Sequence, residues 1–229
     1  MVRVQIPAGK TWFDIQKGHF ANVPILDEHE RRGVSTTEFL EATESTVTIF
    51  DLLGSAVFTP IKHDMLFNVG RVRERQKTSA DATSTLQALI KDELASGAHW
   101  AAEGLMWLVR GLDFMAHAFR ADLKDNEAVA VTEKHPRKEL GALFRESYKT
   151  TLSPYHTAMI RPIFRAAMSA APRRKDFYTR LTGQGVDAEV TRQALEKWVA
   201  ALEEIVCILQ EFLASDEGKW SEGNEESAK

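Results

Sequence analysis

The chain has 229 residues, 44% of them hydrophobic and 27% charged, which suits one globular domain with a single hydrophobic core. Its 29 Lys and Arg residues against 33 Asp and Glu residues give a net charge of -4, so we expect no nucleic acid as a partner. The first residues lack the apolar run of a signal peptide, and no stretch approaches the roughly 20 apolar residues of a membrane span, so we expect a cytoplasmic protein.

The chain divides into an N-terminal arm (1–33), one domain (34–216) and an acidic tail (217–229) that we expect to be disordered beyond Trp220. The arm carries hydrophobic residues that can form a short amphipathic segment packed on the domain: Trp12, Phe13, Ile15 and Phe20. A mobile loop with a charged run, which contains His29, should follow. No second cluster has the spacing of metal ligands, so we expect no metal and no other cofactor.

The domain is predicted to be all α-helical, because hydrophobic residues recur at helical spacing and no segment shows convincing period-two alternation. Seven or eight helices of this length pack as two layers around one core. The helices are expected at 36–53, 59–75, 85–96, 99–123, 139–152, 154–171, 176–181 and 187–212.

Particular residues mark where these helices begin, bend and end. Thr36 or Thr37 should cap the first helix, and Gly54 suits the left-handed turn after it. Pro162 should kink the helix expected at 154–171. Asp187 should cap the last helix.

The last helix carries the only cysteine of the chain, Cys207, within an otherwise hydrophobic run. This context predicts a buried thiol without a disulfide partner. Val190 and Trp198 on the same helix are also predicted to be core residues, because they belong to its hydrophobic repeat.

The helix predicted at 59–75 places polar residues beside an apolar stripe. At 100° per residue, four of them fall within a narrow arc: Asp64, Asn68, Arg71 and Arg75. One interpretation is a solvated helix edge on which neighbouring side chains pair. The other is a binding site, with an acceptor, an amide and two cations along the margin of a buried face.

The helix predicted at 99–123 alternates flat rings with gaps. Two sets of residues recur every seven positions on nearly the same side: Trp100, Trp107 and Phe114, and Gly104, Gly111 and Ala118. A glycine costs about 0.5–1 kcal/mol relative to alanine in a helix interior, so both glycines require a reason. Either a neighbouring helix approaches closely or a ligand lies flat against the rings.

The sequence contains none of the common catalytic motifs. It lacks the serine hydrolase elbow, the phosphate-binding loop, the dinucleotide fingerprint and the Glu-x-x-His pairs of all-α metal enzymes. Asp64 and His156 could face one cavity as acid and base, but nothing supplies a nucleophile or an activated water. We therefore do not expect an enzyme.

Several motifs in fixed order resemble the glycolipid transfer protein family. They are FLEATESTVTIFDLLGS, VFTPIKHDMLFNVGR, LMWLVRGLDF and YHTAMIRPIFRAAMSAAPRRKDF, and the resemblance extends roughly from Phe39 to Trp220. The segments TWFDIQKGHFANVP and FLASDEGKW resemble the fungal branch, which is associated with heterokaryon incompatibility. The resemblance implies a two-layer sandwich of about eight helices that transfers one glycosphingolipid at a time between membranes, without chemical change.

The resemblance also implies which residues bind the lipid. Asp64, Asn68 and Arg71 would hold the sugar, and Asp64 would also accept from the lipid amide. Trp107 would lie under the sugar ring, and His156 would donate to the amide carbonyl. The hydrocarbon tunnel would be lined by Phe50, Leu53, Phe58, Ile61, Phe114, Leu152, Phe164 and Phe177. For each tunnel residue, simple core packing is the alternative.

Two positions depart from the family pattern. Arg71 stands where the family has a lysine, which keeps the charge but replaces a compact ammonium with a planar fork. Ala158 stands where the family has an interfacial tryptophan, so membrane docking would depend on Trp220 or on the cations of 161–175. Trp100 is expected in the core or at the membrane interface, outside the sugar site.

The expected partners are a glycosphingolipid and, transiently, a membrane surface, with the protein a monomer peripheral to membranes. A related branch of the family carries ceramide-1-phosphate and should have further cations in place of the amide and the indole. Asn68 and Trp107 therefore favour a sugar. The alternatives are a ceramide-1-phosphate carrier and, from a different class, a sensor or signalling scaffold that binds the lipid and reports to a partner.

Overall fold

The computed structural model describes residues 5–28, 31–78 and 84–220. The α-helices are α1 (Thr36–Thr46), α2 (Ile49–Leu53), α3 (Thr59–Thr78), α4 (Leu86–Ala95), α5 (Trp100–Asp125), α6 (Leu140–Thr150), α7 (Arg161–Ser169), α8 (Arg174–Leu181) and α9 (Ala188–Ala214). Short 3-10 helices are η1 (Phe13–Ile15), η2 (Phe20–Asn22) and η3 (Ala56–Phe58). An antiparallel pair of strands, β1 (Ile25–Glu28) and β2 (Arg31–Val34), completes the described elements.

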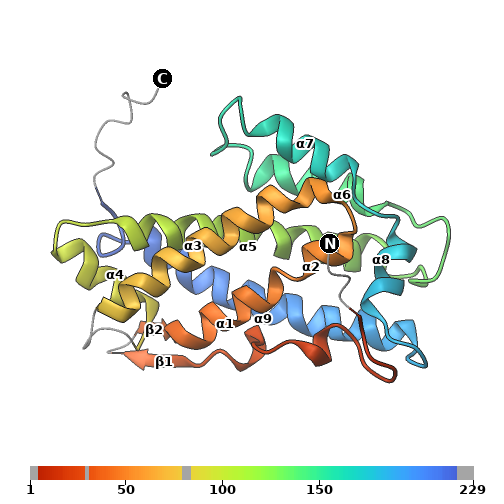
Figure 1. Cartoon of the computed structure of the whole chain (residues 1–229), viewed down its shortest axis with the longest axis horizontal. Coiled ribbons are helices and arrows are strands. Elements are labelled where there is room, and N and C mark those ends of the chain that lie inside the picture. The colour runs from red at the N-terminus through yellow and green to blue at the C-terminus, as the bar shows by residue number, and fades with distance from the viewer. Residues whose placement is uncertain (1–4, 29–30, 79–83, 221–229) are drawn as a thin grey trace.

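Helix α5 runs through the middle of the molecule and is contacted by α3, α4, α6 and α9 (Figure 1). Helix α7 packs on α6, and α8 packs on α9. The buried hydrophobic residues of these elements form one cluster, so they share one core. The predicted helical sandwich is confirmed. Within 5–28, 31–78 and 84–220, no helix combines the length and the hydrophobicity that crossing a membrane requires.

The N-terminal arm is part of this core. Trp12 is fully buried, and its indole N–H donates to the Thr48 hydroxyl at 2.9 Å. Phe13 and Phe20 are also buried, and both pack within 6.4 Å of Trp198, measured between ring centroids. The prediction that a hydrophobic segment of the arm packs on the domain is therefore confirmed, and so is the burial of Trp198.

The strands β1 and β2 were not predicted. Each has only four residues, and the charged run that begins in β1 hides any alternation. The expected mobile loop falls in part on strand residues and in part on residues 29–30, which lie outside the described part. Gln87 on α4 fixes β2, because its amide accepts from the Val34 N–H at 2.9 Å and donates to the Arg32 carbonyl at 3.0 Å.

The helix predicted at 36–53 is in fact two helices. Ser35, and neither threonine, takes the N-cap position of α1. The break follows Thr46, where the Thr48 hydroxyl donates to the Ser45 carbonyl at 2.7 Å and accepts from Trp12. A hydroxyl that bonds to nearby backbone competes with the helical pattern. Gly54 adopts φ 76°, which confirms the predicted left-handed turn.

Helix α7 begins later than predicted, and Pro162 does not kink it. Residues 151–160 form turns, and Pro162 lies in the first turn of α7. Proline lacks the N–H that is unpaired in a first helical turn anyway, so this position tolerates it. His156 therefore belongs to a loop instead of a helix. The predicted N-cap of α9 at Asp187 is confirmed, because its side chain accepts from the Glu189 N–H.

Two predicted core residues of α9 face solvent. Cys207 is exposed, with its sulfur 3.5 Å from the Glu211 carboxylate, and Val190 is 51% exposed. In both cases the buried face of the helix is formed by other members of the hydrophobic run. An uninterrupted apolar run does not show which of its positions points outward.

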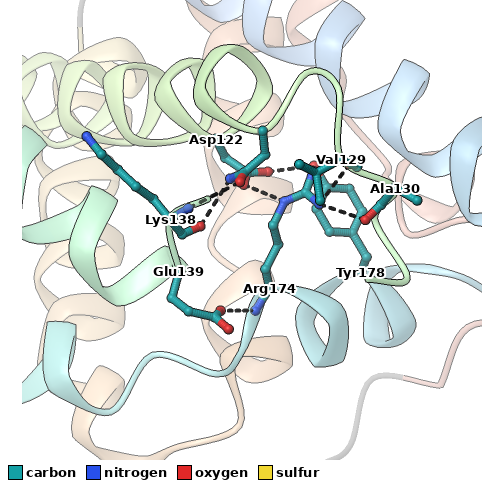
Figure 2. Close-up of polar contacts among 8 residues, drawn as sticks. Asp122, Val129, Ala130, Lys138, Glu139, Arg174 and Tyr178 are labelled. Atoms are coloured by element: carbon teal, nitrogen blue, oxygen red, sulfur yellow. Dashed lines mark hydrogen bonds and ion pairs between the residues drawn. The ribbon is translucent and has the colours of Figure 1, made fainter. Parts of the chain in front are cut away.

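A buried polar cluster ties α8 to α5 (Figure 2). The Asp122 carboxylate on α5 accepts from Arg174 Nε at 2.7 Å, from the Tyr178 hydroxyl at 2.8 Å and from Asn126 Nδ2 at 2.9 Å. Arg174 also donates to the carbonyl of Ala130 at 3.2 Å. Burial and the Asp122 charge raise the pKa of Tyr178, so its hydroxyl stays a donor. The sequence did not indicate this cluster.

Candidate functional site

A cavity of about 420 Å³ lies between α3, α5, α6 and α7, which is within the usual range of small-molecule sites. Its lining comes from α2, η3 and these four helices, together with the turns before α7, and is mostly hydrophobic. Among the described residues that line it, four have polar side chains: Asp64, Asn68, Arg71 and His156. All four were predicted as headgroup ligands.

Seven of the eight predicted tunnel residues line this cavity: Phe50, Leu53, Phe58, Ile61, Phe114, Leu152 and Phe164. Phe177 does not, because α8 places it behind the wall. Its fully buried ring stacks on Phe119, with centroids 5.5 Å apart and an interplanar angle of 11°. Phe119 itself lines the cavity. Further lining residues that were not predicted include Met65, Leu108, Met115, Phe144, Ile163 and Met168.

The polar row on α3 is joined by its own contacts. Asn68 donates to the Asp64 carbonyl at 3.0 Å and lies 3.4 Å from its carboxylate, and Arg71 donates to Asn68 Oδ1 at 3.3 Å. Arg71 also pairs with Glu103 on α5. Local pairing and cavity lining, which were the two interpretations of this row, are thus both present. Arg75 does not line the cavity and pairs with Asp92.

Asp64 has a perturbed carboxyl group. The cavity wall partly removes it from water, which raises its pKa, while the positive charge of Arg71 acts in the opposite direction. The side chain still reaches the surface. A carboxylate that lies at a cavity mouth and has little internal hydrogen bonding can accept from a ligand N–H or O–H.

His156 packs among aromatic rings opposite this row. Its ring centroid lies 5.9 Å from that of Trp107, at an interplanar angle of 24°, and 4.4 Å from that of Phe164. Its Nδ1 is 3.1 Å from the Tyr148 hydroxyl. Burial, together with the charges of Arg161 and Arg110, lowers the pKa of His156 to about 4. The imidazole is therefore neutral at physiological pH.

The Tyr148 hydroxyl fits the tautomer of that imidazole that carries its proton on Nε2. Burial raises the pKa of Tyr148, so its hydroxyl keeps its proton and can donate to His156 Nδ1. A ring that accepts at Nδ1 carries its proton on Nε2. His156 then offers one N–H donor to the cavity, which it also lines. Tyr148 was missed by sequence reasoning, although it lies eight residues before the histidine motif.

The guanidinium group of Arg110 stacks beside Trp107. The Arg110 guanidinium carbon lies 4.9 Å from the centre of the Trp107 ring and 3.7 Å from that of Tyr155. Both distances are within the range of cation–π contacts. Arg110 and the His156 ring both contact Trp107, and together they hold the plane of the indole.

The two glycines of α5 have different reasons. A Cβ at Gly104 would lie 3.1 Å from Arg71 Cβ and 3.2 Å from the Asn68 carbonyl, so this glycine allows α3 to approach closely. A Cβ at Gly111 would meet nothing within 4 Å, and Gly111 lines the cavity. The first glycine thus fits the close-approach interpretation and the second fits the ligand interpretation.

Trp100 is not a core residue. Its side chain is 50% exposed, and the Arg71 guanidinium carbon lies 3.9 Å from its ring centre. Of the two predicted locations, the core is excluded, and the exposure fits the other, the membrane interface, which stays a prediction. Trp100 is the first residue of α5.

Together these groups suit a ligand with a long apolar part and a polar end. The hydrophobic lining can replace water around hydrocarbon, the Asp64 carboxylate can accept, and Asn68 and His156 can donate. Burying the polar end without such partners would cost roughly 2–7 kcal/mol.

Known proteins share both the sequence and the shape of this chain. The family model described as "Glycolipid transfer protein (GLTP)" matches residues 34–183. A glycolipid transfer protein of Aureobasidium melanogenum is 45% identical over 214 residues, which are 93% of this chain and 98% of that protein.

Two solved structures extend the comparison. HET-C2, described as a fungal glycolipid transfer protein, has a TM-score of 0.82 and 42% identity, over 92% of this chain and all of the other. FAPP2, described as selecting simple glycosphingolipids with the same fold, has a TM-score of 0.74 and 26% identity, over 89% of this chain and 94% of the other.

Proposed function

This chain belongs to the glycolipid transfer protein family, and on that basis we propose that it carries one glycosphingolipid at a time between membranes. The observation that carries the proposal is the apolar cavity whose polar side chains are those expected to hold a sugar and a lipid amide. The lipid leaves the site chemically unchanged, and the protein acts as a monomer.

A cavity is needed because the lipid has long hydrocarbon chains. Each CH₂ group gains about 0.8 kcal/mol when it is removed from water, so a lipid with two long chains does not cross water unaided at a useful rate. Side chains such as Phe50, Phe114 and Phe164 offer a replacement apolar surface. The carrier thus removes the solvation penalty that opposes release from the membrane.

The polar residues of the cavity are assigned to the polar end of the lipid. We assign Asp64 to accept from the lipid amide and from a sugar hydroxyl, and Asn68 and Arg71 to the rim of the sugar. Trp107 presents its indole to the C–H face of the ring. Neutral His156 donates from Nε2 to the amide carbonyl, with Tyr148 holding the ring by its Nδ1.

The docking face is proposed to be the turn before α7 and the start of that helix. Ala158 replaces the family's interfacial tryptophan, but the adjacent Met159 is 84% exposed. Further exposed side chains of this face are Tyr155, Ile160, Arg161, Ile163 and Arg165. Apolar groups flanked by arginines suit the surface of an anionic bilayer. Trp220 instead stacks on His99, with ring centroids 6.1 Å apart.

Sedimentation of the protein with vesicles tests this docking face. We expect binding to increase with the anionic lipid content and to fall as salt is raised, because exposed charges are screened. Met159→Ser should weaken binding, whereas Val190→Ser, at an exposed hydrophobic position of α9, should not. Binding that changes neither with the anionic lipid content nor with the salt concentration would show that the arginines do not contribute to the docking face.

Transfer of a fluorescent glycosphingolipid between donor and acceptor vesicles tests the function itself. The wild-type protein should move glucosylceramide and should prefer it to ceramide-1-phosphate. Trp107→Ala should lower the transfer rate about tenfold through loss of the sugar platform. A protein that binds the lipid tightly but moves little of it would be a sensor and not a carrier.

A further inference from the structure

Helix α8 supports two parts of the cavity wall, although none of its own residues lines the cavity. Its Phe177 stacks on Phe119, a lining residue. Its Arg180 reaches α2, where the guanidinium Nη1 donates to the carbonyls of Leu52 and Leu53, both at 2.9 Å. We call these two hydrogen bonds the α2 clamp. Because Leu52 and Leu53 are the last residues of α2, the α2 clamp satisfies carbonyls that the helix itself leaves unpaired.

Helix α2 is too short to hold its position by itself. It has five residues, whereas isolated helices shorter than about 12–15 residues are marginal in water. Nevertheless, three of its residues line the cavity: Ile49, Phe50 and Leu53. The position of this part of the wall therefore depends on the contacts of α2 with the rest of the protein.

Other polar contacts of α2 lie at its start and in its middle. The hydroxyl of Thr48, the N-cap residue, accepts from the buried Trp12 indole at 2.9 Å. Asp51 pairs with Lys62 on α3 at 2.6 Å, and such a partly exposed pair contributes little. The end of α2 has the α2 clamp, whose arginine is exposed. Substitution of this one surface side chain therefore releases the end of α2 without disturbing the core.

The residue after α2 leaves room for the guanidinium. Gly54 has φ 76°, and a Cβ at this position would collide with Arg180 Nη1. Helix α8 is in turn fixed to α5, because Arg174 and Tyr178 both donate to the Asp122 carboxylate (Figure 2). The α2 clamp thus joins a short wall segment to a rigid part of the fold.

The cavity must widen to hold a glycosphingolipid. Its volume of about 420 Å³ lies near the lower end of the range for drug-sized ligands, and a lipid with two long chains is larger. Movement of α2 would widen it at the cost of displacing few residues, and would carry Phe50 and Leu53 outward. How far α2 can move depends on what holds its end.

From these observations, and resting on the function proposed above, we infer that Arg180 is a positioning residue that limits the length of the bound acyl chain. It contacts no lipid itself. By holding the last carbonyls of α2, it keeps Phe50 and Leu53 against the hydrocarbon. Acyl chains of moderate length are then bound tightly, and very long chains are disfavoured.

Competition between two glucosylceramides that differ only in the acyl chain tests the α2 clamp. The protein is incubated with vesicles that contain equal amounts of the palmitoyl and the lignoceroyl lipid, and native mass spectrometry measures how much of each is bound. Arg180→Ala should raise the ratio of lignoceroyl to palmitoyl lipid about fivefold over wild type, the equivalent of one ordinary hydrogen bond. Arg180→Lys should restore most of the wild-type ratio, because an ammonium can still donate to both carbonyls.

Arg120→Gln is the matched control. It breaks a guanidinium contact between α5 and α9, and α9 does not line the cavity. The ratio of bound lipids should stay at the wild-type value, because a general loss of stability affects both lipids alike. Hydrogen exchange adds a local measurement: the backbone amides of residues 50–58 should exchange faster in Arg180→Ala and not in Arg120→Gln.

An unchanged lipid ratio in Arg180→Ala would overturn the limit on acyl length, and faster exchange at 50–58 alone would leave Arg180 with a purely structural role. An equal change of the ratio in Arg120→Gln would overturn it as well. Failure of the wild-type protein to bind either lipid would instead contradict the proposed function. Binding of both lipids with no response to Arg180→Ala would count against the α2 clamp alone.

Discussion

Two polar clusters beside α5 combine carboxylate, amide and guanidinium groups, but they differ in how fully these groups are bonded inside the protein. In the closed cluster (Asp122, Asn126, Arg174 and Tyr178), the Asp122 carboxylate accepts from all three partners (Figure 2). The side chains of Asp122 and Arg174 are 0% and 1% exposed. Neither carboxylate oxygen of Asp122 is left for a ligand, and the cluster fixes α8 to α5.

In the open cluster (Asp64, Asn68, Arg71 and Glu103), the carboxylate at the cavity is poorly bonded. Asp64 is 3.4 Å from the Asn68 amide, a long contact, and its side chain reaches the surface. Burial raises the pKa of Asp64, and the nearby charge of Arg71 offsets only part of this effect. The same residue types thus stabilise the fold where the carboxylate is fully bonded and can bind a ligand where it is not.

The largest effect is expected from breaking the closed cluster. Asp122→Asn leaves the buried Arg174 charge uncompensated, and we expect the free energy of unfolding to fall by about 3–5 kcal/mol. Urea denaturation measures this. Arg120→Gln, which breaks a partly exposed pair with Glu203, should cost at most about 1 kcal/mol.

Replacing both charges sharpens the same test. Asp122→Leu combined with Arg174→Met removes the need for pairing, so the double variant should be more stable than Asp122→Asn. If Asp122→Asn were no more costly than Arg120→Gln, the closed cluster would not be a stabilising element and the contrast with the open cluster would fail.

The open cluster should respond in the opposite way. Asp64→Val should leave stability within about 0.5 kcal/mol, because Asp64 has little internal hydrogen bonding. Glycosphingolipid transfer should nevertheless fall about 10-fold to 100-fold, the equivalent of one hydrogen bond to a charged group. Asp51→Asn is the control, since Asp51 pairs with Lys62 at 2.6 Å and does not line the cavity. Full transfer by Asp64→Val would dismiss the open cluster as the headgroup site.

A third test uses pH. The pKa of His156 lies at about 4 in the folded protein, below its usual 6.5, so the folded state resists protonation of the ring. The contribution of His156 to the free energy of unfolding is therefore present in full above pH 6.5 and is lost as the pH falls toward 4. We expect a loss of about 1–2 kcal/mol after allowing for solvent screening.

The pH effect is measured by urea denaturation at pH 7 and pH 4.5. His156→Gln should make the difference between the two pH values smaller, whereas His63→Gln, at an exposed position of α3, should not. An identical pH dependence in wild type and His156→Gln would show that the ring is not held neutral by its surroundings.

Much of the open cluster could be predicted because its pattern is local. Asp64, Asn68 and Arg71 share one arc of one helix, and the rings and gaps of α5 repeat every seven residues. Helical spacing reports such arrangements directly. The motifs of the family placed His156 beside Trp107, which no spacing could do, since the two residues are on separate elements. Their roles in lipid binding stay predictions.

The closed cluster could not be predicted for the opposite reason. Asp122 and Arg174 are 52 positions apart, and neither stands in a periodic pattern that marks it as buried. Sequence spacing also failed at Cys207, Val190 and Pro162, where a helix orientation or a helix start depends on tertiary packing.

The smallest expected effects separate the two glycines of α5. Gly111→Ala places a methyl group in open space, so the helix should gain about 0.5–1 kcal/mol of stability. The same methyl group takes room from the cavity, and transfer of lipids with long acyl chains should decrease. Thermal unfolding and the transfer assay measure the two effects on one variant.

Gly104→Ala should behave differently, because its methyl group would meet Arg71 Cβ at 3.1 Å and the Asn68 carbonyl at 3.2 Å. Helix α3 must then move away by a few tenths of an ångström, which offsets the gain in helix propensity and disturbs Asn68 and Arg71. We expect no stabilisation, and a loss of transfer that is independent of acyl length. If both variants were stabilised equally and transferred long and short lipids alike, α5 would have no ligand-facing gap at Gly111, and the hydrophobic space beside the open cluster would not hold the lipid chains.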